Sequence, residues 1–293
     1  MNKNQTIQSG HYHLKTIVRG SGIPLIIIGS ADYYLRVMPT ALFDHFQCVF
    51  VDHRGFAECD VIPNASDATL EAISADIKLV MDELGIEKAW VFGHSGHALM
   101  ATHFAVTFPQ YVEGLVLANI SPNLSPQMQA LQFQRWEQEA DEERKQVFER
   151  NFPLLARDIE QNPERKFVHL CHRLGAMRWY DPDFNELPLW KGFTTHTALL
   201  DKLWGEVFAE FNTAIYQQLP AVQVLVISGE KDFSIAPVSS WDQIDFGEAD
   251  MKIEIIAESA HTPMLEQSER FVKAMSQFCL LYTSPSPRDR YIS

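Results

Sequence analysis

The segment that most constrains the fold is a pair of apolar runs joined by a serine. Residues 89–92 are typical of a buried strand, and residues 98–108 are typical of a buried helix. The turn between them reads Gly93-His94-Ser95-Gly96-His97. A serine flanked by glycines at such a junction predicts a sharp turn, because glycine fits a crowded bend that other residues do not. The turn would raise the Ser95 hydroxyl above the edge of a sheet, where it can act as a nucleophile.

Apolar runs and helical periodicity alternate on both sides of this turn. We expect further strands at 13–18, 23–28, 46–51, 115–118, 222–228 and 251–256, and helices at 68–84 and 269–278. The strand segments are apolar nearly throughout rather than at every second position, which is typical of strands buried on both faces. The sequence therefore predicts an α/β fold with a mostly parallel central sheet and helices on both faces.

The middle of the chain interrupts this pattern. From residue 122 to residue 219 the sequence is charged and aromatic, has helical spacing and contains no clear strand, and Pro122 and Pro220 bracket it. We expect helices here over 137–150, 167–179 and 197–211. The simplest organisation has three parts, a first core half, an inserted all-helical cap and a second core half, at residues 1–121, 122–219 and 220–278.

The end of the chain does not continue the pattern either. The string from Cys279 to Asp289 matches one reading-frame translation of a transposase sequencing adapter, and its polar, proline-rich part follows the expected last helix abruptly. We therefore expect residues 279–293 to be a non-native tail. An ordinary disordered tail is the alternative.

The composition argues against several kinds of partner. The chain has 24 Lys and Arg against 38 Asp and Glu, a formal net charge of −14, which argues against binding to nucleic acid or to an anionic membrane surface. No run approaches the roughly 20 apolar residues that span a bilayer, and the N-terminus has no apolar signal segment. The four cysteines form no CxxC pair, so we expect a cytoplasmic protein without a disulfide framework. The expected partner is a small-molecule substrate, and the oligomeric state is left open.

A serine nucleophile needs a base that takes its proton and an acid that orients this base. Asp232 and His261 each come directly after one of the last two predicted strands. The carboxyl ends of parallel strands meet at one edge of a sheet, so we expect both side chains beside Ser95. Glu230 is the nearest rival acid, but it comes earlier in its turn and is expected to face solvent.

The negatively charged oxygen that forms during acyl transfer needs two N–H donors. The amide that follows the nucleophile, the amide of Gly96, is one predicted donor. The second is the amide of Ser30, in the loop after the strand at 23–28, where Gly29 lets the backbone approach a ligand closely.

Metal and cofactor sites are not expected. His94 with His97, and His169 with His172, have a spacing that suits a metal, but neither pair has a matching set of carboxylates or cysteines. The glycines around Ser95 lack the G-x-G spacing of a dinucleotide-binding turn.

In these features the chain resembles the α/β-hydrolase superfamily, in the capped serine-hydrolase branch that includes esterases, lactonases, C–C bond hydrolases and proline iminopeptidase-like enzymes. The resemblance covers about residues 14–278. It is carried by the G-x-S-x-G turn at 93–97, the acid loop with Gly229, Asp232 and Pro237, the histidine segment at His261, and the D-x-R-G loop with Asp52, Arg54 and Gly55. The resemblance implies an α/β-hydrolase fold with an inserted cap, and a triad made of Ser95, Asp232 and His261.

Four features depart from the family pattern. Three of them are Ile28-Gly29 in place of His-Gly, Ala57 and Cys59 in place of Gly and Ser, and Ala260 in place of Gly before the histidine. The fourth is His97, which replaces the last glycine of the nucleophile turn. An imidazole there needs small neighbours or a displaced helix. Two interpretations of His97 stay open, a packed and hydrogen-bonded side chain or a direct contact with substrate.

The expected activity is hydrolysis of a small, fairly apolar ester or related acyl substrate through an acyl-enzyme on Ser95. A serine argues against epoxide and haloalkane hydrolysis, which members of the superfamily perform with an aspartate at that position. Two alternatives stay open. A proline iminopeptidase-like aminopeptidase would need cap carboxylates that face a substrate ammonium, and residues 137–149 supply carboxylates. A receptor-like member would bind a ligand with little turnover.

Overall fold

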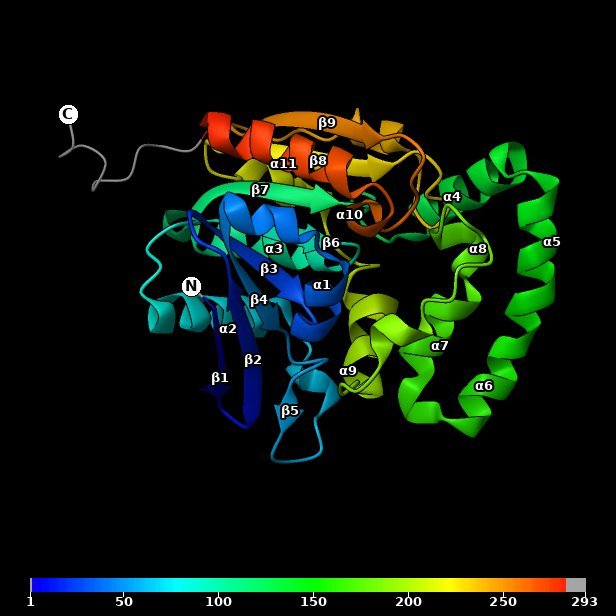
Figure 1. The fold of residues 1–293 in the computed structure, drawn as a ribbon, viewed down its shortest axis with the longest axis horizontal. Coiled ribbons are helices and arrows are strands. Elements are labelled where there is room, and N and C mark those ends of the chain that lie inside the picture. Colours follow the sequence, from blue (N-terminus) through cyan, green and yellow to red (C-terminus); the bar gives the residue numbers. More distant parts are fainter. Residues whose placement is uncertain (1, 283–293) are drawn as a thin grey trace.

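The computed structural model describes residues 2–282, and these contain one nine-stranded sheet (Figure 1). Its strands are β1 (Lys3–Ser9), β2 (Tyr12–Arg19), β3 (Ile23–Gly29), β4 (Phe46–Asp52), β5 (Glu58–Cys59), β6 (Ala89–His94), β7 (Val112–Ala118), β8 (Gln223–Gly229) and β9 (Asp250–Ile256). The sheet order is β1-β2-β4-β3-β6-β7-β8-β9, and β5 pairs with β2. The six strands β3, β4 and β6 to β9 are parallel, while β1, β2 and β5 pair antiparallel. The predicted α/β fold with a mostly parallel sheet is confirmed.

Two strands, β1 and the two-residue β5, have no counterpart in the sequence analysis. Strand β1 is polar, with the sequence Lys-Asn-Gln-Thr-Ile-Gln-Ser, and only Ile7 within it is buried. It pairs with β2 alone, at the edge of the sheet. An edge strand buries little apolar surface, so its sequence carries none of the hydrophobic pattern by which the central strands were found.

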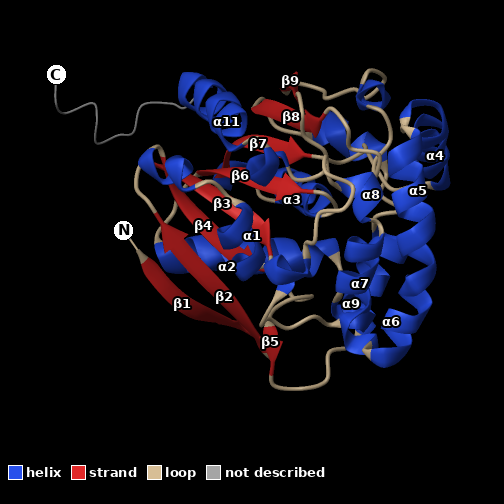
Figure 2. Cartoon of the chain, turned by 45° about the vertical axis from the view of Figure 1, so that its right-hand side comes forward, coloured by secondary structure: helices blue, strands red, loops and turns tan. Residues whose placement is uncertain are grey.

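Helices cover both faces of the sheet, as predicted. Helices α2 (Leu70–Leu84) and α3 (His97–Thr107) pack on one face, and α1 (Ala31–Val37) and α11 (Ser268–Tyr282) pack on the other (Figure 2). Strand β3 shows why its sequence is apolar throughout. Ile26 and Ile28 belong to the core on the α2–α3 side, Leu25 and Ile27 belong to the core on the α1–α11 side, and all four are fully buried.

Between β7 and β8 the described chain is helical. Its α-helices are α4 (Pro126–Glu139), α5 (Glu142–Asn151), α6 (Leu155–Gln161), α7 (Lys166–Arg173), α8 (Gly175–Arg178) and α9 (Thr197–Lys202). They form a layer beyond the carboxyl ends of the parallel strands (Figure 1). We call this layer, residues 122–219, the cap. A short helix, α10 (Pro263–Glu266), follows β9 in the core.

The helices predicted within the cap are each divided in the structure. The expected helix over 137–150 is interrupted at Ala140, and α5 then begins because the Asp141 side chain accepts a hydrogen bond from the amide of Arg144 at 2.8 Å. Residues 167–179 form α7 and α8, and residues 197–211 form α9 followed by a π-helix over Leu203–Val207. Apolar periodicity continues across such breaks, so it did not reveal them.

The last helix, α11, ends later than predicted. It continues past residue 278 to Tyr282, and Cys279 within it is fully buried. The fold therefore includes at least four residues that the sequence analysis assigned to the tail. The remaining part of that segment, 283–293, lies outside the described residues, and its non-native origin stays a prediction.

One arginine of α5 holds the end of α8 in place. The side chain of Arg144 is 4% exposed, and its Nη1 donates to the carbonyl oxygens of Ala176 and Trp179, at 2.7 and 2.6 Å. Its Nη2 donates to the carbonyl oxygen of Tyr180 at 2.6 Å. The last carbonyls of a helix have no partner within the helix, so a guanidinium at this position satisfies groups that would otherwise be buried unpaired.

We expect Arg144→Met to lower the free energy of unfolding by about 3 kcal/mol, because it leaves the buried carbonyls of Ala176 and Trp179 and the half-buried carbonyl of Tyr180 without this donor. Arg150→Met is the matched control in the same helix, since Arg150 is 60% exposed and forms a surface ion pair with Asp183. Urea denaturation followed by circular dichroism measures both variants. Equal stability of the two variants would show that Arg144 does not hold the end of α8.

Candidate active site

The turn around Ser95 has the strained geometry that the sequence predicted. Ser95 follows β6 and has a φ of 57°, an uncommon value for a residue other than glycine, and its amide donates to the carbonyl of Ala118 at 2.8 Å. A Cβ on Gly93 would lie 2.4 Å from the Cα of Ala98, and a Cβ on Gly96 would lie 2.5 Å from the ring of Phe208. Both positions therefore exclude larger residues. Ser95 lines the cavity described below.

Asp232 and His261 lie side by side, each after the strand expected to precede it. The Nδ1 of His261 lies 2.8 Å from the Oδ2 of Asp232, and both side chains are buried. Burial alone raises the pKa of the Asp232 carboxyl, but the charge and hydrogen bond of His261, with hydrogen bonds from two further residues, bring it down to about 2. Glu230, the rival acid, is exposed and accepts a hydrogen bond from the amide of Glu258.

Two residues that the sequence analysis missed complete the surroundings of Asp232. The Nδ2 of Asn119 donates to Oδ2 at 2.8 Å, and the Oγ of Ser234 donates to Oδ1 at 2.5 Å. Ser234 Oγ also lies 2.9 Å from the Nδ1 of His261. Asn119 directly follows β7, the position after a parallel strand at which Asp232 and His261 were also found. That position was the signal by which Asn119 could have been recognised.

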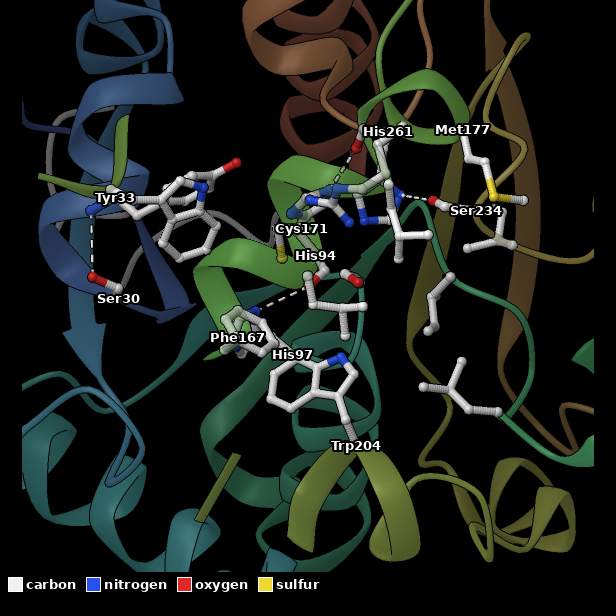
Figure 3. A pocket seen from close by; sticks show the side chains of 18 of the residues that line it. Ser30, Tyr33, His94, His97, Phe167, Cys171, Met177, Trp204, Ser234 and His261 are labelled. Carbon is white, nitrogen blue, oxygen red and sulfur yellow. Dashed lines mark hydrogen bonds between the residues drawn. The ribbon is translucent and has the colours of Figure 1, made fainter. Parts of the chain in front are cut away.

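The Nε2 of His261 makes no hydrogen bond within the described part of the chain. Burial lowers the pKa of His261 below 6.5, its ordinary value, although Asp232 opposes this effect. Its Nε2 is buried and has no hydrogen-bond partner within residues 2–282, so no hydrogen bond joins it to Ser95 here. His261 and Ser95 nevertheless line the same cavity, and Figure 3 shows His261 in its wall. A neutral imidazole with a free Nε2 is the form that can accept a proton.

The loop before α1 brings Ser30 to the same cavity. The side chain of Ser30 accepts a hydrogen bond from the amide of Tyr33 at 3.4 Å and so caps α1 (Figure 3). The next amide, that of Ala31, donates to the buried Oδ1 of Asp52 at 2.6 Å, which holds the loop against the end of β4. Burial raises the pKa of this Asp52 carboxyl to about 8.

His97 is part of a chain of buried hydrogen bonds. The amide of Gly55 donates to the Nδ1 of His53 at 3.0 Å, so the proton of this neutral ring is on Nε2. His53 Nε2 lies 3.2 Å from the Nε2 of His97 and therefore donates to it. The Nδ1 of His97 then carries the proton of that ring, and two acceptors lie within reach of it, the hydroxyl of Tyr34 at 2.9 Å and the carbonyl oxygen of His94 at 3.0 Å.

This series of hydrogen bonds reaches His261, the predicted catalytic histidine. The Nε2 of His94 donates to the carbonyl oxygen of His261 at 2.6 Å, so its Nδ1 accepts a hydrogen bond from the hydroxyl of Tyr34 at 3.1 Å. Burial lowers the pKa of His97 to about 3, and it also holds the pKa values of His53 and His94 well below the ordinary range. All three rings are therefore neutral, as the directions of these hydrogen bonds require.

The room for the His97 imidazole comes from Gly29. A Cβ on Gly29 would lie 2.0 Å from the Cε2 of Tyr34 and 3.2 Å from the Cε1 of His97. Both rings therefore pack over a residue that has no side chain. Of the two interpretations of His97, the structure provides a packed, hydrogen-bonded role, and His97 also lines the cavity.

The cavity has a volume of about 600 Å³ and lies between the sheet and the cap (Figure 3). Ser95, His97 and His261 line it from the core, and Phe167, Trp190 and Trp204 line it from the cap. The aromatic residues of the cap therefore form much of its wall. A cavity of this size between domains is typical of a small-molecule site.

Within residues 2–282 no group of three or more His, Cys, Asp or Glu side chains is arranged to hold a metal ion. No helix of this part of the chain is long and apolar enough to cross a membrane.

The parallel sheet, the cap between β7 and β8 and the serine turn beside the Asp232–His261 pair define a class of protein, the α/β-hydrolases. The sequence pattern of the family described as alpha/beta hydrolase fold matches residues 22–267, so the chain belongs to this family of hydrolases. It is 37% identical over 265 residues to "AB hydrolase superfamily protein YclE" of Bacillus subtilis (strain 168), a match that covers 90% of this chain and 94% of that protein.

Solved structures agree on the fold. The chain is similar to an esterase from Exiguobacterium antarcticum, with a TM-score of 0.68, 17% identity and coverage of 94% of this chain and 99% of that chain. It is also similar to a proline iminopeptidase of Mycobacterium smegmatis, with a TM-score of 0.65, 14% identity and coverage of 96% and 98%. At these identities the likeness concerns the fold alone.

We expect Tyr34→Phe to lower the free energy of unfolding by about 2 kcal/mol, because it leaves the buried Nδ1 of His94 without its donor, whereas the Nδ1 of His97 keeps the carbonyl oxygen of His94. Tyr180→Phe is the control, since Tyr180 is 43% exposed. Chemical denaturation measures both variants. A Tyr34→Phe protein as stable as the control would contradict the chain of hydrogen bonds described above.

Proposed function

We propose that the chain hydrolyses small carboxylic esters through an acyl-enzyme on Ser95. The observation that carries this proposal is the buried Asp232–His261 pair, whose free Nε2 lines the same cavity as Ser95. The proposal requires the Oγ of Ser95 to approach this nitrogen when substrate binds, a contact that commonly tightens only in the complex.

The reaction follows from these groups. The Oγ of Ser95 bonds to the ester carbonyl carbon while its proton passes to the Nε2 of His261, and Asp232 stabilises the imidazolium. The carbonyl oxygen becomes an anion, and the amides of Gly96 and Ser30 are the proposed donors to it. Neither amide donates to another acceptor within residues 2–282. His261 next gives the proton to the departing alkoxide, and a water molecule that it deprotonates then releases the acid from Ser95.

The lining of the cavity favours an ester over an aminopeptidase substrate. The carboxylates at 137–149 are all exposed on α4 and α5, and none of them lines the cavity. Asp201 does line it, but its Oδ2 is paired with the Nζ of Lys166 at 2.7 Å. The aromatic side chains of the wall suit an apolar acyl or alcohol group. An aminopeptidase of the proline iminopeptidase type is therefore the less supported alternative.

We expect a fluorophosphonate probe to label the wild-type protein at one serine and to leave Ser95→Ala unlabelled, because only a serine activated by a base reacts. Ser66→Ala, which alters an exposed serine, is the control and should label normally. Mass spectrometry of the labelled peptide identifies the site. Unlabelled wild-type protein would contradict the proposal and favour a ligand-binding member with little turnover.

The same proposal makes a prediction about pH. The base must be neutral to take a proton, and burial lowers the pKa of His261 below 6.5, so kcat/KM for p-nitrophenyl butyrate should fall as the pH is lowered, with its half-maximal value at a pH below 6.5. Asp232→Asn should reduce kcat by about 10⁴-fold, since it removes the group that orients the imidazole. Faster cleavage of a prolyl arylamide than of the ester would support the aminopeptidase instead.

A further inference from the structure

Arg178 is a buried cation in the wall of the cavity. It is the last residue of α8, it is 9% exposed, and it lines the cavity together with Ser95 and His261. Its backbone is bound to the catalytic loops, because its carbonyl oxygen accepts a hydrogen bond from the amide of His261 at 2.7 Å. The preceding carbonyl, that of Met177, accepts one from the amide of Phe233 at 3.0 Å. The position of the Arg178 side chain is therefore set relative to the reacting groups.

The guanidinium of Arg178 makes no hydrogen bond to any residue between 2 and 282. Its Nε is buried without a partner, and the nearest carboxylate oxygen, Oε1 of Glu186, is 3.7 Å away. The two oxygens of Glu186 instead accept hydrogen bonds from the indoles of Trp179 and Trp190, at 3.2 and 2.9 Å. A buried guanidinium offers five N–H groups, and leaving them unpaired is costly unless a ligand uses them.

The charge of Arg178 persists in this environment. Burial alone lowers the pKa of the guanidinium, but the neighbouring Cys171 and Glu186 oppose this effect, and the net result is a pKa above the ordinary value. Glu186 has no exposed surface and balances this charge. Arg178 is therefore charged, and its N–H groups are free to donate to a ligand in the cavity.

A second buried donor lines the same cavity. The hydroxyl of Tyr33 is buried beside that of Thr262 and makes no hydrogen bond of ordinary geometry within residues 2–282. Its ring is stacked on that of Trp190 with centroids 4.3 Å apart. Burial raises the pKa of this hydroxyl, so it keeps its proton and can donate. The other cation that lines the cavity, Lys166, is already paired with Asp201. Arg178 and Tyr33 thus offer hydrogen-bond donors, while the nearby acceptor, Glu186, is occupied.

We propose that Arg178 and Tyr33 form a subsite for a carboxylate of the substrate, so that the esters hydrolysed are those that carry a carboxylate on the acyl or the alcohol part. A carboxylate offers two acceptor oxygens and no donor, and a guanidinium binds it through two parallel hydrogen bonds. This inference rests on the proposed function, because it names the substrate class of that same site.

Two matched pairs of esters test the substrate class. Monomethyl adipate and methyl hexanoate differ only by a carboxylate on the acyl part, and butanoylglycolate and ethyl butanoate differ in the same way on the alcohol part. We expect kcat/KM to be at least about 10-fold higher for the carboxylate member of one pair. The pair that shows the preference identifies the part that reaches Arg178. No preference in either pair would overturn the proposal.

The variant Arg178→Met with Glu186→Gln removes the guanidinium without leaving a buried carboxylate uncompensated, and it keeps an acceptor for one of the two indoles. It should abolish the preference, so that kcat/KM differs by less than about 2-fold within each pair. The matched control is Arg173→Met with Asp158→Asn, which removes a similar ion pair of the cap, at 2.6 Å, that does not line the cavity. An unchanged preference in the Arg178 variant, or an equal loss in the control, would contradict the subsite.

Folding of each variant is checked by near-ultraviolet circular dichroism. If the double variant does not fold, Arg178→Lys replaces it, because lysine keeps the charge but loses the two parallel donors. That variant should lose only part of the preference, about 3-fold. A preference equal to that of the wild type would count against the proposal.

A binding measurement separates this inference from the proposed function. Adipamate, the monoamide of adipate, should bind to Ser95→Ala, measured by calorimetry, and hexanamide, which has a methyl group in place of its carboxylate, should bind at least about 10-fold more weakly. If adipamate binds in this way but no ester is hydrolysed, the ester hydrolase proposal fails and the carboxylate subsite stands. If the esters are hydrolysed but adipamate binds no better than hexanamide, the subsite fails alone.

Discussion

Asp232 is a carboxylate without any exposed surface, and a charge buried in this way has to be matched by donors from its surroundings. Asn119, Ser234 and His261 supply them, and they come from the ends of three neighbouring parallel strands or the loops that follow. The need to pair the buried charge of Asp232 therefore restricts how the loops after β7, β8 and β9 can be arranged. Because the carboxylate is fully hydrogen-bonded, it stays ionised, and this is the state that can orient and stabilise a protonated His261.

The backbone of His261 is held from two sides. Its amide donates to the carbonyl of Arg178 in the cap, and its carbonyl accepts from His94 in the nucleophile turn. The cap and the turn therefore both contribute to the position of the same imidazole. Through Tyr34 and His97 this hydrogen bonding extends to His53 in the loop after β4, so several loops around the cavity form one connected structure.

The core of the fold could be predicted because strands that are buried on both faces are apolar at nearly every position. Strand β3 is apolar at every position from Leu25 to Ile28, and each of these side chains is fully buried. Strand β1 and the breaks in the cap helices were not predicted. The first lies at an edge where little apolar surface is buried, and the breaks depend on local caps such as Asp141 that periodicity does not reveal.

For the site, the sequence by itself determined which residue types follow which strands, and so it identified Ser95, Asp232 and His261 as candidates that a parallel sheet would bring to one edge. It also identified His97 as a departure from the family pattern, at the last position of the G-x-S-x-G turn. Only the tertiary structure decided what surrounds them. Tyr34 fits beside His97 because Gly29 has no side chain, and Arg178 reaches the cavity because α8 turns back onto the loops of Asp232 and His261. Such contacts join residues far apart in the chain, and they arise from packing in three dimensions, which no local pattern records.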